Sequence, residues 1–246
     1  MRAGGGLNGN EQPVIYLDGM RIANEEIGGT GSNQLTTGGQ GLSSLLDFNP
    51  DDIQNIEILK GPAAATSYGT NGSNGVVFIE TRKGTASDSG PIFNYKQTNG
   101  INSPQFKVDK GFQNRDLFHS LLSNGAVSDK YFSMSGGDYR FRHFLSFSSR
   151  NEEGMIIWKD KNYFDRKTVR ANFDFLPLDN LSLSINTSYS SIDAIMPPSD
   201  NHIYGLMYNT LVAYSPWQES DSTSLSQLGI KFGSNRIVAS ANVKYY

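Results

Sequence analysis

Lys167–Leu176 reads KTVRANFDFL and Leu181–Ser191 reads LSLSINTSYSS, and the short turn Pro177–Asn180 lies between them. Apolar and polar residues alternate along both stretches, and they do so again in Tyr139–Ser149, YRFRHFLSFSS. Because successive side chains of a β-strand point to opposite faces, this alternation predicts strands about ten residues long, each with one polar face. The order of the stretches predicts an antiparallel β meander.

The same alternation predicts which side chains share a face of the sheet. One face is expected to carry Phe141, Leu145, Val169, Phe173, Leu183 and Ile185, and the other Ser146, Arg170, Asn172, Ser184 and Asn186. If the sheet is the wall of a membrane barrel, the first set faces lipid and the second faces the lumen. An arginine should then be costly at Phe173 and mild at Asn172.

Two architectures fit this alternation. The strands of a soluble β-sandwich also have one wet face, and the pattern alone favours that fold. A transmembrane β-barrel is favoured by the long strands, by a short turn that alternates with longer loops, and by aromatic residues near the predicted strand ends. Those aromatic residues are Tyr139, Tyr163, Phe164 and Tyr189. Together these features make the barrel the preferred interpretation.

Composition and charge exclude several classes of protein. The 246 residues carry 21 Lys and Arg against 24 Asp and Glu, and this net charge of -3 gives no basic patch for nucleic acid and no acidic tail. Cysteine is absent, which excludes disulfides, thiolate metal sites and a cysteine nucleophile. The longest apolar runs, such as Val76–Ile79 and Met155–Trp158, are too short for a membrane-spanning helix, whereas the alternating strands of a barrel stay allowed.

Glycines gather in the first part of the chain, where short elements are expected. Pro13–Leu17 predicts a strand, Asp18–Gly19 a type I′ turn and Met20–Ile22 the returning strand, because Asp and Gly tolerate positive φ. Glu25–Gly41 is expected to be a glycine-rich loop.

Short capped helices and strands follow. Asn49 is a favoured N-cap and Pro50 suits the first helical position, so a one-turn helix is expected there, followed by the strand Ile56–Leu59. A second short helix is expected between Gly61 and Gly69, and Val76–Thr81 predicts another strand. These elements together indicate a small α+β unit.

Four pieces of this region, in order, resemble the plug domain of TonB-dependent outer-membrane receptors, in the SusC/RagA-like variant of Bacteroidota. The pieces are Pro13–Gly19, Asn49–Lys60, Ala63–Gly69, and Asn74–Ile79 with Thr81–Gly84. Tyr131–Gly137 and Glu152–Ile156 resemble the first barrel strands of such receptors, so the resemblance extends to about Tyr189. Met1–Gly4 resembles the arginine-glycine segment inside the plug, with Ala3 where glycine is usual. This implies that the signal peptide, the TonB box and the first plug strands lie upstream.

The resemblance divides the chain into a plug domain truncated at its N-terminus over 1–84, a joint or linker over 85–130, and incomplete barrel strands and loops over 131–246. Large outer-membrane transporters close about 22 strands around a plugged lumen. The residues after Gly84 suffice for roughly four to seven strands. The expected fold class is therefore an α+β plug domain followed by the antiparallel meander of an incomplete barrel. Ile203–Tyr214 has the spacing of a loop helix, and Ile230–Tyr246 has strand character without an assigned place.

The sequence predicts no catalytic residue, no cofactor site and no metal site. Three histidines, far apart and without the spacing of metal ligands, are His119, His143 and His202. Gly69–Gly75 lacks a phosphate-loop motif, and Asp47–Asp52 lacks the glycine and the glutamate of a calcium loop. The adjacent carboxylates of Glu25–Glu26 and of Glu152–Glu153, the latter in a tight connection or at a strand end, are expected to point apart.

Two function classes remain, and an enzyme is the least favoured alternative. By resemblance, the first is an import receptor in the lipid of the outer membrane, whose plug gates the barrel lumen and whose energising partner, TonB, acts from the periplasm. SusC-like members take up glycans or peptides together with a surface-exposed SusD-like lipoprotein. Their ligand contacts come largely from extracellular loops, so no ligand-binding residue is assigned. The second class is a secreted, β-rich carbohydrate-binding or adhesive module.

Overall fold

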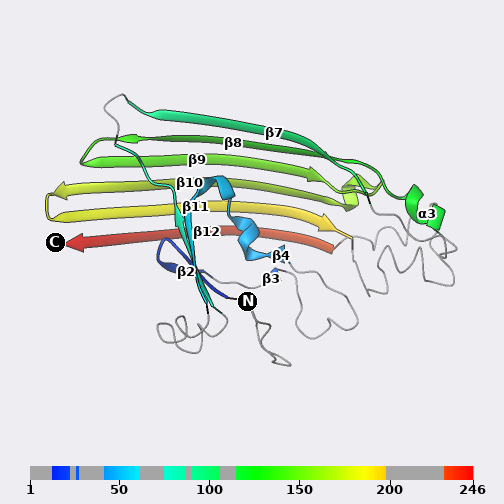
Figure 1. Ribbon diagram of the computed structural model, residues 1–246, viewed down its shortest axis with the longest axis horizontal. Coiled ribbons are helices and arrows are strands. Elements are labelled where there is room, and N and C mark those ends of the chain that lie inside the picture. The colour runs from blue at the N-terminus through cyan, green and yellow to red at the C-terminus, as the bar shows by residue number, and fades with distance from the viewer. Residues whose placement is uncertain are drawn as a thin grey trace.

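The computed structural model describes residues 13–22, 26–27, 42–60, 75–86, 90–105, 115–197 and 230–245. In this part of the chain, a small four-stranded sheet lies against one face of a large six-stranded sheet (Figure 1). A two-stranded ladder joins β3 Glu26–Ile27 to β4 Leu42–Ser43. Of the helices in these ranges, none has the length and the apolar character needed to cross a membrane.

The large sheet is an antiparallel meander, as predicted. Its strands are β7 Ile92–Asn102, β8 Gly125–Gly137, β9 Phe141–Glu153, β10 Tyr163–Leu178, β11 Leu181–Met196 and β12 Ile230–Tyr245. They are ordered β12-β11-β10-β9-β8-β7, and each neighbouring pair is antiparallel. The sheet is open, and β7 and β12 are its two edges (Figure 1).

The connections between these strands alternate in length. Asp138–Arg140 and Asp179–Asn180 form short turns at one end of the sheet. The connections at the other end, over 103–124, 154–162 and 197–229, are longer. The sheet therefore has a short-turn end and a long-connection end.

Two of the long connections pack on one another. The helix α3 Arg115–Ser120 lies in the first, and the 3-10 helix η4 Lys159–Lys161 lies in the second. Phe118 and Leu121 form an apolar cluster with Ile156, and the backbone N–H of Ile157 donates to the carbonyl of Leu121 over 3.0 Å. The long-connection end thus carries a small apolar core of its own.

The small sheet has the order β2-β1-β6-β5. Its strands are β1 Val14–Leu17, β2 Met20–Ile22, β5 Ile53–Leu59 and β6 Val76–Thr81. β1 is parallel to β6 and antiparallel to β2. In the turn from β1 to β2, Asp18 has φ 48 and Gly19 has φ 83, the positive angles that the predicted type I′ turn requires.

The segment before β5 contains two short 3-10 helices, η1 Ser44–Asp47 and η2 Pro50–Asp52. Asn49 caps η2, and its Oδ1 accepts a hydrogen bond from the backbone N–H of Asp51 over 3.0 Å. The predicted cap is therefore confirmed. We refer to residues 13–22, 42–60 and 75–86 together as the small-sheet unit.

The two faces of the large sheet differ in polarity. Positions that face the small-sheet unit are buried and mostly polar, and they include Ser146, Ser148, Arg166, Thr168, Arg170, Asn172, Asp174, Asn186 and Ser190. Positions on the opposite face are apolar and exposed, and they include Phe132, Phe141, Phe147, Val169, Phe175, Ile185, Ile237 and Val243. The two predicted sets of side chains thus lie on opposite faces, with the polar set turned inward.

Several strands depart from their predicted bounds. The segment 85–130, expected as a joint or linker, contains β7, α3 and the first part of β8. β10 and β11 each have 16 residues, because their backbone ladder continues through Tyr163–Arg166 and Ile192–Met196, beyond the predicted stretches. Tyr189 accordingly lies in the middle of β11, not near its end. Pro177 belongs to β10, where the register shifts between Phe175 and Leu178.

The remaining expectations have mixed outcomes. The unplaced segment 230–246 contains β12, which pairs with β11. β5 begins at Ile53 instead of Ile56, directly after η2. Other calls lie outside the described residues, namely Met1–Gly4, most of the loop Glu25–Gly41, the helix between Gly61 and Gly69, and the helix Ile203–Tyr214. The division into 1–84, 85–130 and 131–246 stays a prediction.

Candidate functional site: the interface between the two sheets

Arg170 of β10 connects two separate elements of the small-sheet unit. Its guanidinium lies 3.6 Å from Asp18 Oδ2, in the β1–β2 turn, and 3.5 Å from Asp52 Oδ2, at the end of η2. All three side chains are buried. Removing one member of such a group leaves a buried charge without its partner, so the three groups depend on one another.

Thr81, the last residue of β6, is a second attachment point. Its backbone N–H and its hydroxyl donate to the two carboxylate oxygens of Asp18 over 2.9 Å and 2.8 Å. The side-chain amide of Asn172 donates to Thr81 Oγ1 over 2.9 Å and to the carbonyl of Arg82 over 2.8 Å. Because Arg170 and Asn172 are two positions apart on one strand, they present both contacts on the same face.

Tyr131 and Lys96 extend these contacts to β8 and β7. The Tyr131 hydroxyl donates to Asp52 Oδ1 over 3.0 Å, so the Asp52 carboxylate interacts with both β8 and β10. The Lys96 ammonium lies 2.8 Å from Asp51 Oδ1, in a more exposed position. Together these contacts fix the η2 region against β8, β10 and the edge strand β7 of the large sheet.

Arg166 and Arg236 hold the segment around η1 at a level nearer the long-connection end. Arg166 Nη1 donates to the carbonyls of Leu46 and Phe48 over 3.0 Å and 3.1 Å. Arg236 Nε, on β12, lies 3.1 Å from Asp47 Oδ2. The short helices are therefore bound through both their backbone and their side chains.

The carboxyl group of Asp47 is itself buried, and this burial changes its ionisation. Burial raises the pKa of Asp47, and the positive charges of Arg236 and Arg166 oppose that effect. The ionised form of Asp47 thus depends on the charges of β10 and β12.

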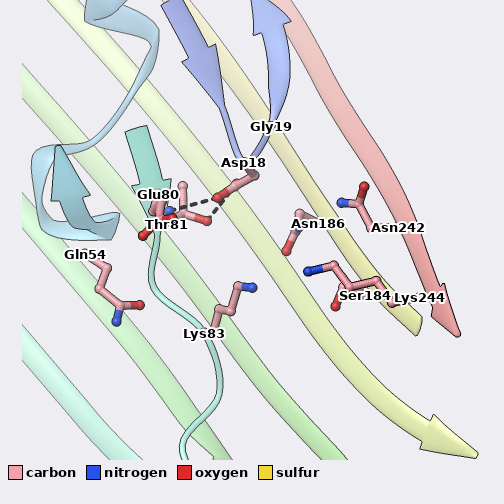
Figure 2. A pocket seen from close by; sticks show the side chains of 10 residues that line it. All are labelled: Asp18, Gly19, Gln54, Glu80, Thr81, Lys83, Ser184, Asn186, Asn242 and Lys244. Atoms are coloured by element: carbon pink, nitrogen blue, oxygen red, sulfur yellow. Dashed lines mark hydrogen bonds between the residues drawn. The ribbon is translucent and has the colours of Figure 1, made fainter. Parts of the chain in front are cut away.

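Cavities border the interface at both ends. At the short-turn end, a cavity of about 450 Å³ lies between the β1–β2 turn and strands β11 and β12 (Figure 2). Its lining is polar apart from Gly19 and includes Gln54, Lys83, Ser184, Asn186, Asn242 and Lys244. Figure 2 shows Lys83 and Lys244 extending into this space from opposite sides.

Two further cavities lie beside the same unit. One of about 950 Å³, also at the short-turn end, is bordered by residues 82–86 and by strands β7, β8 and β9. The other, of about 540 Å³, lies at the long-connection end above η1 and η2, where Leu45, Leu46, Phe164 and Met196 are close to Asp129 and Arg150. The contacts between the small-sheet unit and the large sheet thus lie between cavities at the short-turn end and a cavity at the long-connection end.

The residues considered for catalysis or metal binding have other places in the structure. His119 lies in α3, His143 lies on β9, and His202 lies outside the described residues. Glu152 accepts hydrogen bonds from Asn102 and Arg150, and Glu153 accepts one from the backbone N–H of Ala126, so this pair points apart as predicted. Within the described ranges, no group of three or more His, Asp or Glu side chains could hold a metal ion.

Sequence patterning identified one half of this interface. It placed Arg170 and Asn172 on the polar face of a strand, and it treated Asp47–Asp52 as part of a helix cap. It did not identify Asp18, Asp52, Tyr131, Arg166 or Arg236 as partners across the interface. A charged residue at an inward position of a predicted barrel strand is the signal that could have indicated them.

Comparison with known proteins places these observations in a family. Residues 4–76 match the family described as the TonB-dependent Receptor Plug Domain. The chain is 28% identical over 212 residues to the TonB-dependent receptor SusC of Bacteroides thetaiotaomicron, a match that covers 77% of this chain and 20% of SusC. A TonB-dependent receptor of Formosa agariphila is 42% identical over 176 residues, with 60% of this chain and 17% of that receptor covered.

Solved structures show the same fold. The RagAB peptide importer in its closed-closed state aligns with a TM-score of 0.66 at 16% identity, and the alignment covers 98% of this chain and 33% of that one. The siderophore receptor PirA from Acinetobacter baumannii aligns with a TM-score of 0.58 at 17% identity, covering 94% of this chain and 30% of PirA. The chain spans about a fifth of the length of the curated relatives it matches.

Proposed function

We propose, from the premise that this chain belongs to the SusC/RagA-like TonB-dependent receptors of the outer membrane, that its small-sheet unit is a plug and that β7–β12 are part of the surrounding barrel wall. The polarity of the large sheet carries this proposal. Its buried face is polar and is joined to the plug through Arg170 and Asn172, whereas its exposed face is apolar. A soluble sandwich buries the apolar faces of both its sheets against each other. The reversed arrangement supports a wall whose outer surface contacts lipid, and it disfavours the secreted binding module.

The alternation of turns and loops supports one orientation in the membrane. Outer-membrane barrels have short periplasmic turns and longer extracellular loops. The turns Asp138–Arg140 and Asp179–Asn180 then lie on the periplasmic side, and α3 lies on the cell surface. The cavity above η1 and η2 faces the medium, whereas the two cavities at the short-turn end face the periplasm.

The role that fits this arrangement is nutrient import. The plug closes the lumen, a glycan or a peptide binds on the outer side, and TonB acts on the plug from the periplasm to open a path. A SusD-like lipoprotein is the expected partner at the cell surface. The RagAB peptide importer and SusC support this assignment by their similarity, and import rather than catalysis is the activity proposed.

Growth tests in the parent organism would examine the proposal. A strain that lacks the gene, and a second strain that lacks TonB, are compared with the wild type on peptide mixtures and on oligosaccharide mixtures as sole nutrients. We expect both strains to lose growth on the same nutrient, and the protein to fractionate with the outer membrane. Growth unaffected by either deletion on every nutrient, or a protein secreted into the medium, would contradict the proposal.

A further inference from the structure

The outer face of the wall changes from apolar to polar between two neighbouring rows of side chains. The first, the apolar row, lies in register across β7 to β12, and all of its members are exposed: Tyr95, Phe132, Phe147, Val169, Tyr189 and Ile237. Two residues along each strand toward the long-connection end lies the polar row, which consists of Gln97, Lys130, Ser149, Lys167, Ser191 and Asn235. Because the spacing is two residues, both rows are on the same face of the sheet.

The apolar row marks one limit of the band that contacts lipid. Toward the short-turn end the same face continues with apolar side chains, among them Met134, Leu145, Phe173 and Ile185. On a transmembrane barrel this band ends at aromatic girdles, where the lipid head groups begin. With the long-connection end at the cell surface, the polar row lies at the level of the head groups of the outer leaflet.

Lys130 and Lys167 are the two cations of the polar row, and a single strand separates them. Both are in register with Ser149 of β9, and both side chains are exposed. Since neighbouring strands lie about 4.8 Å apart, the backbones of the two lysines are roughly 10 Å apart. A strand tilt of about 40° places one lysine roughly 6 Å higher than the other, a difference that their flexible stems can span.

No ion pair within the described ranges includes either of these two ammonium groups. The nearest carboxylates on this face, one step closer to the medium, have other partners. Asp165 accepts a hydrogen bond from the side-chain amide of Asn151 over 2.8 Å. Asp193 accepts one from the Tyr163 hydroxyl over 3.2 Å and lies 3.8 Å from the Lys231 ammonium. The two lysines are thus placed to meet an external anion.

The positions beyond the lysines favour a lipid with a sugar head group. The next row toward the medium is again polar and includes Asn99, Ser128, Asn151, Asp165 and Asp193. Two further residues of strand add about 7 Å of wall above the lysines. Their amide, hydroxyl and carboxylate groups can exchange hydrogen bonds with the hydroxyl groups of sugars.

We propose that Lys130 and Lys167 form a site on the outer surface of the wall for a phosphorylated glycolipid of the outer leaflet. The two ammonium groups bind its phosphate, because charge-assisted hydrogen bonds to phosphate oxygens are strong. The apolar row contacts its acyl chains, and the polar groups beyond the lysines contact its sugars. This inference rests on the barrel wall and the orientation proposed above, and it adds a lipid partner distinct from any imported solute.

Lipid titration of the intact protein in detergent tests the site, with bound lipid measured by native mass spectrometry. The probes are diphosphoryl lipid A, the same lipid after enzymatic removal of its phosphates, and phosphatidylglycerol. The double variant Lys130→Gln/Lys167→Gln removes both cations at exposed positions. The matched control is Lys83→Gln/Lys244→Gln, because both of these lysines line the inner cavity at the short-turn end. Lys130→Arg/Lys167→Arg keeps the charge.

We expect the wild type to bind diphosphoryl lipid A severalfold more tightly than either other lipid. The glutamine variant of Lys130 and Lys167 should lose this preference, whereas the arginine variant and the control should keep it. Equal binding with and without phosphate, or an unchanged preference in the glutamine variant, would overturn the site. An equal affinity for phosphatidylglycerol would overturn the assignment to a glycolipid. A protein that stays monomeric without detergent and binds none of the lipids would instead contradict the membrane wall.

Discussion

The plug and the wall bury opposite kinds of side chain. In the plug, Ile15, Leu17 and Ile79 form a buried apolar cluster, as in a water-soluble domain. In the wall, Thr168 and Arg170 are buried while Val169 between them is exposed. The polarity of each sheet thus fits its expected surroundings, because the plug contacts the polar inner face of the wall and the outer face of the wall is expected to contact lipid.

The interface between them is consequently polar and contains buried ion pairs. The desolvation cost of a buried ion pair offsets much of its electrostatic attraction, so such pairs contribute specificity more than net stability. Arg170 with Asp18 and Asp52, and Arg236 with Asp47, fix the plug in one position. An apolar interface of the same size would favour a permanently closed lumen.

Transfer of the wall from a membrane to aqueous buffer should disturb the protein more than any single substitution. Expressed as the 246-residue chain in aqueous buffer, the protein should aggregate, because β7 and β12 are open edges and one face of the sheet exposes large apolar side chains. Size-exclusion chromatography with and without detergent measures this. A monodisperse monomer without detergent, with one cooperative thermal transition, would contradict the contrast between plug and wall.

Removal of the central charge of the interface should have the next largest effect. Arg170→Met leaves Asp18 and Asp52 buried without their cation, which should cost about 3–5 kcal/mol. The free energy of unfolding, measured by urea titration of the intact protein in detergent micelles, reports the change. Arg140→Met, in the exposed turn between β8 and β9, is the control and should change it little. An equal effect of both variants would show that the buried network is not needed.

A charge on the outward face of the wall should have a smaller effect on the free energy of unfolding. Phe173→Arg should cost about 2–4 kcal/mol near the bilayer midplane. The sequence suggested Asn172 as a mild position for the same change, and the structure corrects this, because the buried Asn172 amide bonds Thr81 and Arg82. Asn242→Arg, which faces the polar cavity, is the better control. Unfolding titrations in phospholipid vesicles should separate the two variants, and equal losses would argue against lipid at Phe173.

Gly84, where the plug leads into the wall, lies against the backbone of His143 and should not tolerate a larger side chain. Gly84→Ala would place its Cβ 2.3 Å from the His143 backbone nitrogen, which should cost about 1–3 kcal/mol as the chain shifts. Gly100→Ala, where a Cβ meets nothing within 4 Å, should be near neutral. Hydrogen exchange of the amides of β6 and β9 would locate the disturbance. Unchanged exchange in Gly84→Ala would mean that the contact yields without cost.

Local pattern was sufficient to predict those elements whose conformation depends on near neighbours in the chain. The alternation in Lys167–Leu176 fixed the faces of β10, the Asp18–Gly19 pair predicted its turn, and Asn49 predicted its cap. Each of these depends on side-chain period, on positive φ or on a hydrogen bond two residues away.

Contacts between distant parts of the chain could not be predicted in this way. Asp52 and Arg170 are both unexceptional locally, and only the position of the plug inside the sheet brings them together. β7 was missed because Ile92–Asn102 is an edge strand whose second half, from Gln97, has mostly polar residues and Gly100. Its pairing with β8 is determined by register across the sheet, which spacing along one strand does not contain.

The exposed carboxylate of Asp138 contrasts with the buried carboxylates of the interface, and its replacement should change stability least of all. Asp138, in the turn between β8 and β9, accepts hydrogen bonds from the backbone N–H groups of Phe141 and Arg140 over 2.8 Å and 2.7 Å. These bonds lower the pKa of Asp138 below its usual value of 3.8, the bond from Phe141 contributing most. Because the folded pKa is the lower one, the ionised group stabilises the turn above pH 3.8, and this contribution is lost as the pH falls through the lowered pKa.

Asp138→Ala should therefore lower the thermal midpoint slightly at neutral pH, and the difference from the wild type should shrink below pH 3.8. Asp138→Asn keeps an uncharged acceptor, so at neutral pH its thermal midpoint should lie between those of Asp138→Ala and the wild type. Because Asp138 is exposed, added salt should weaken the effect further, whereas the effect of Arg170→Met should persist in salt, since its buried partners are screened much less. Equal salt sensitivity at the two sites would mean that water reaches the plug interface as freely as it reaches the turn.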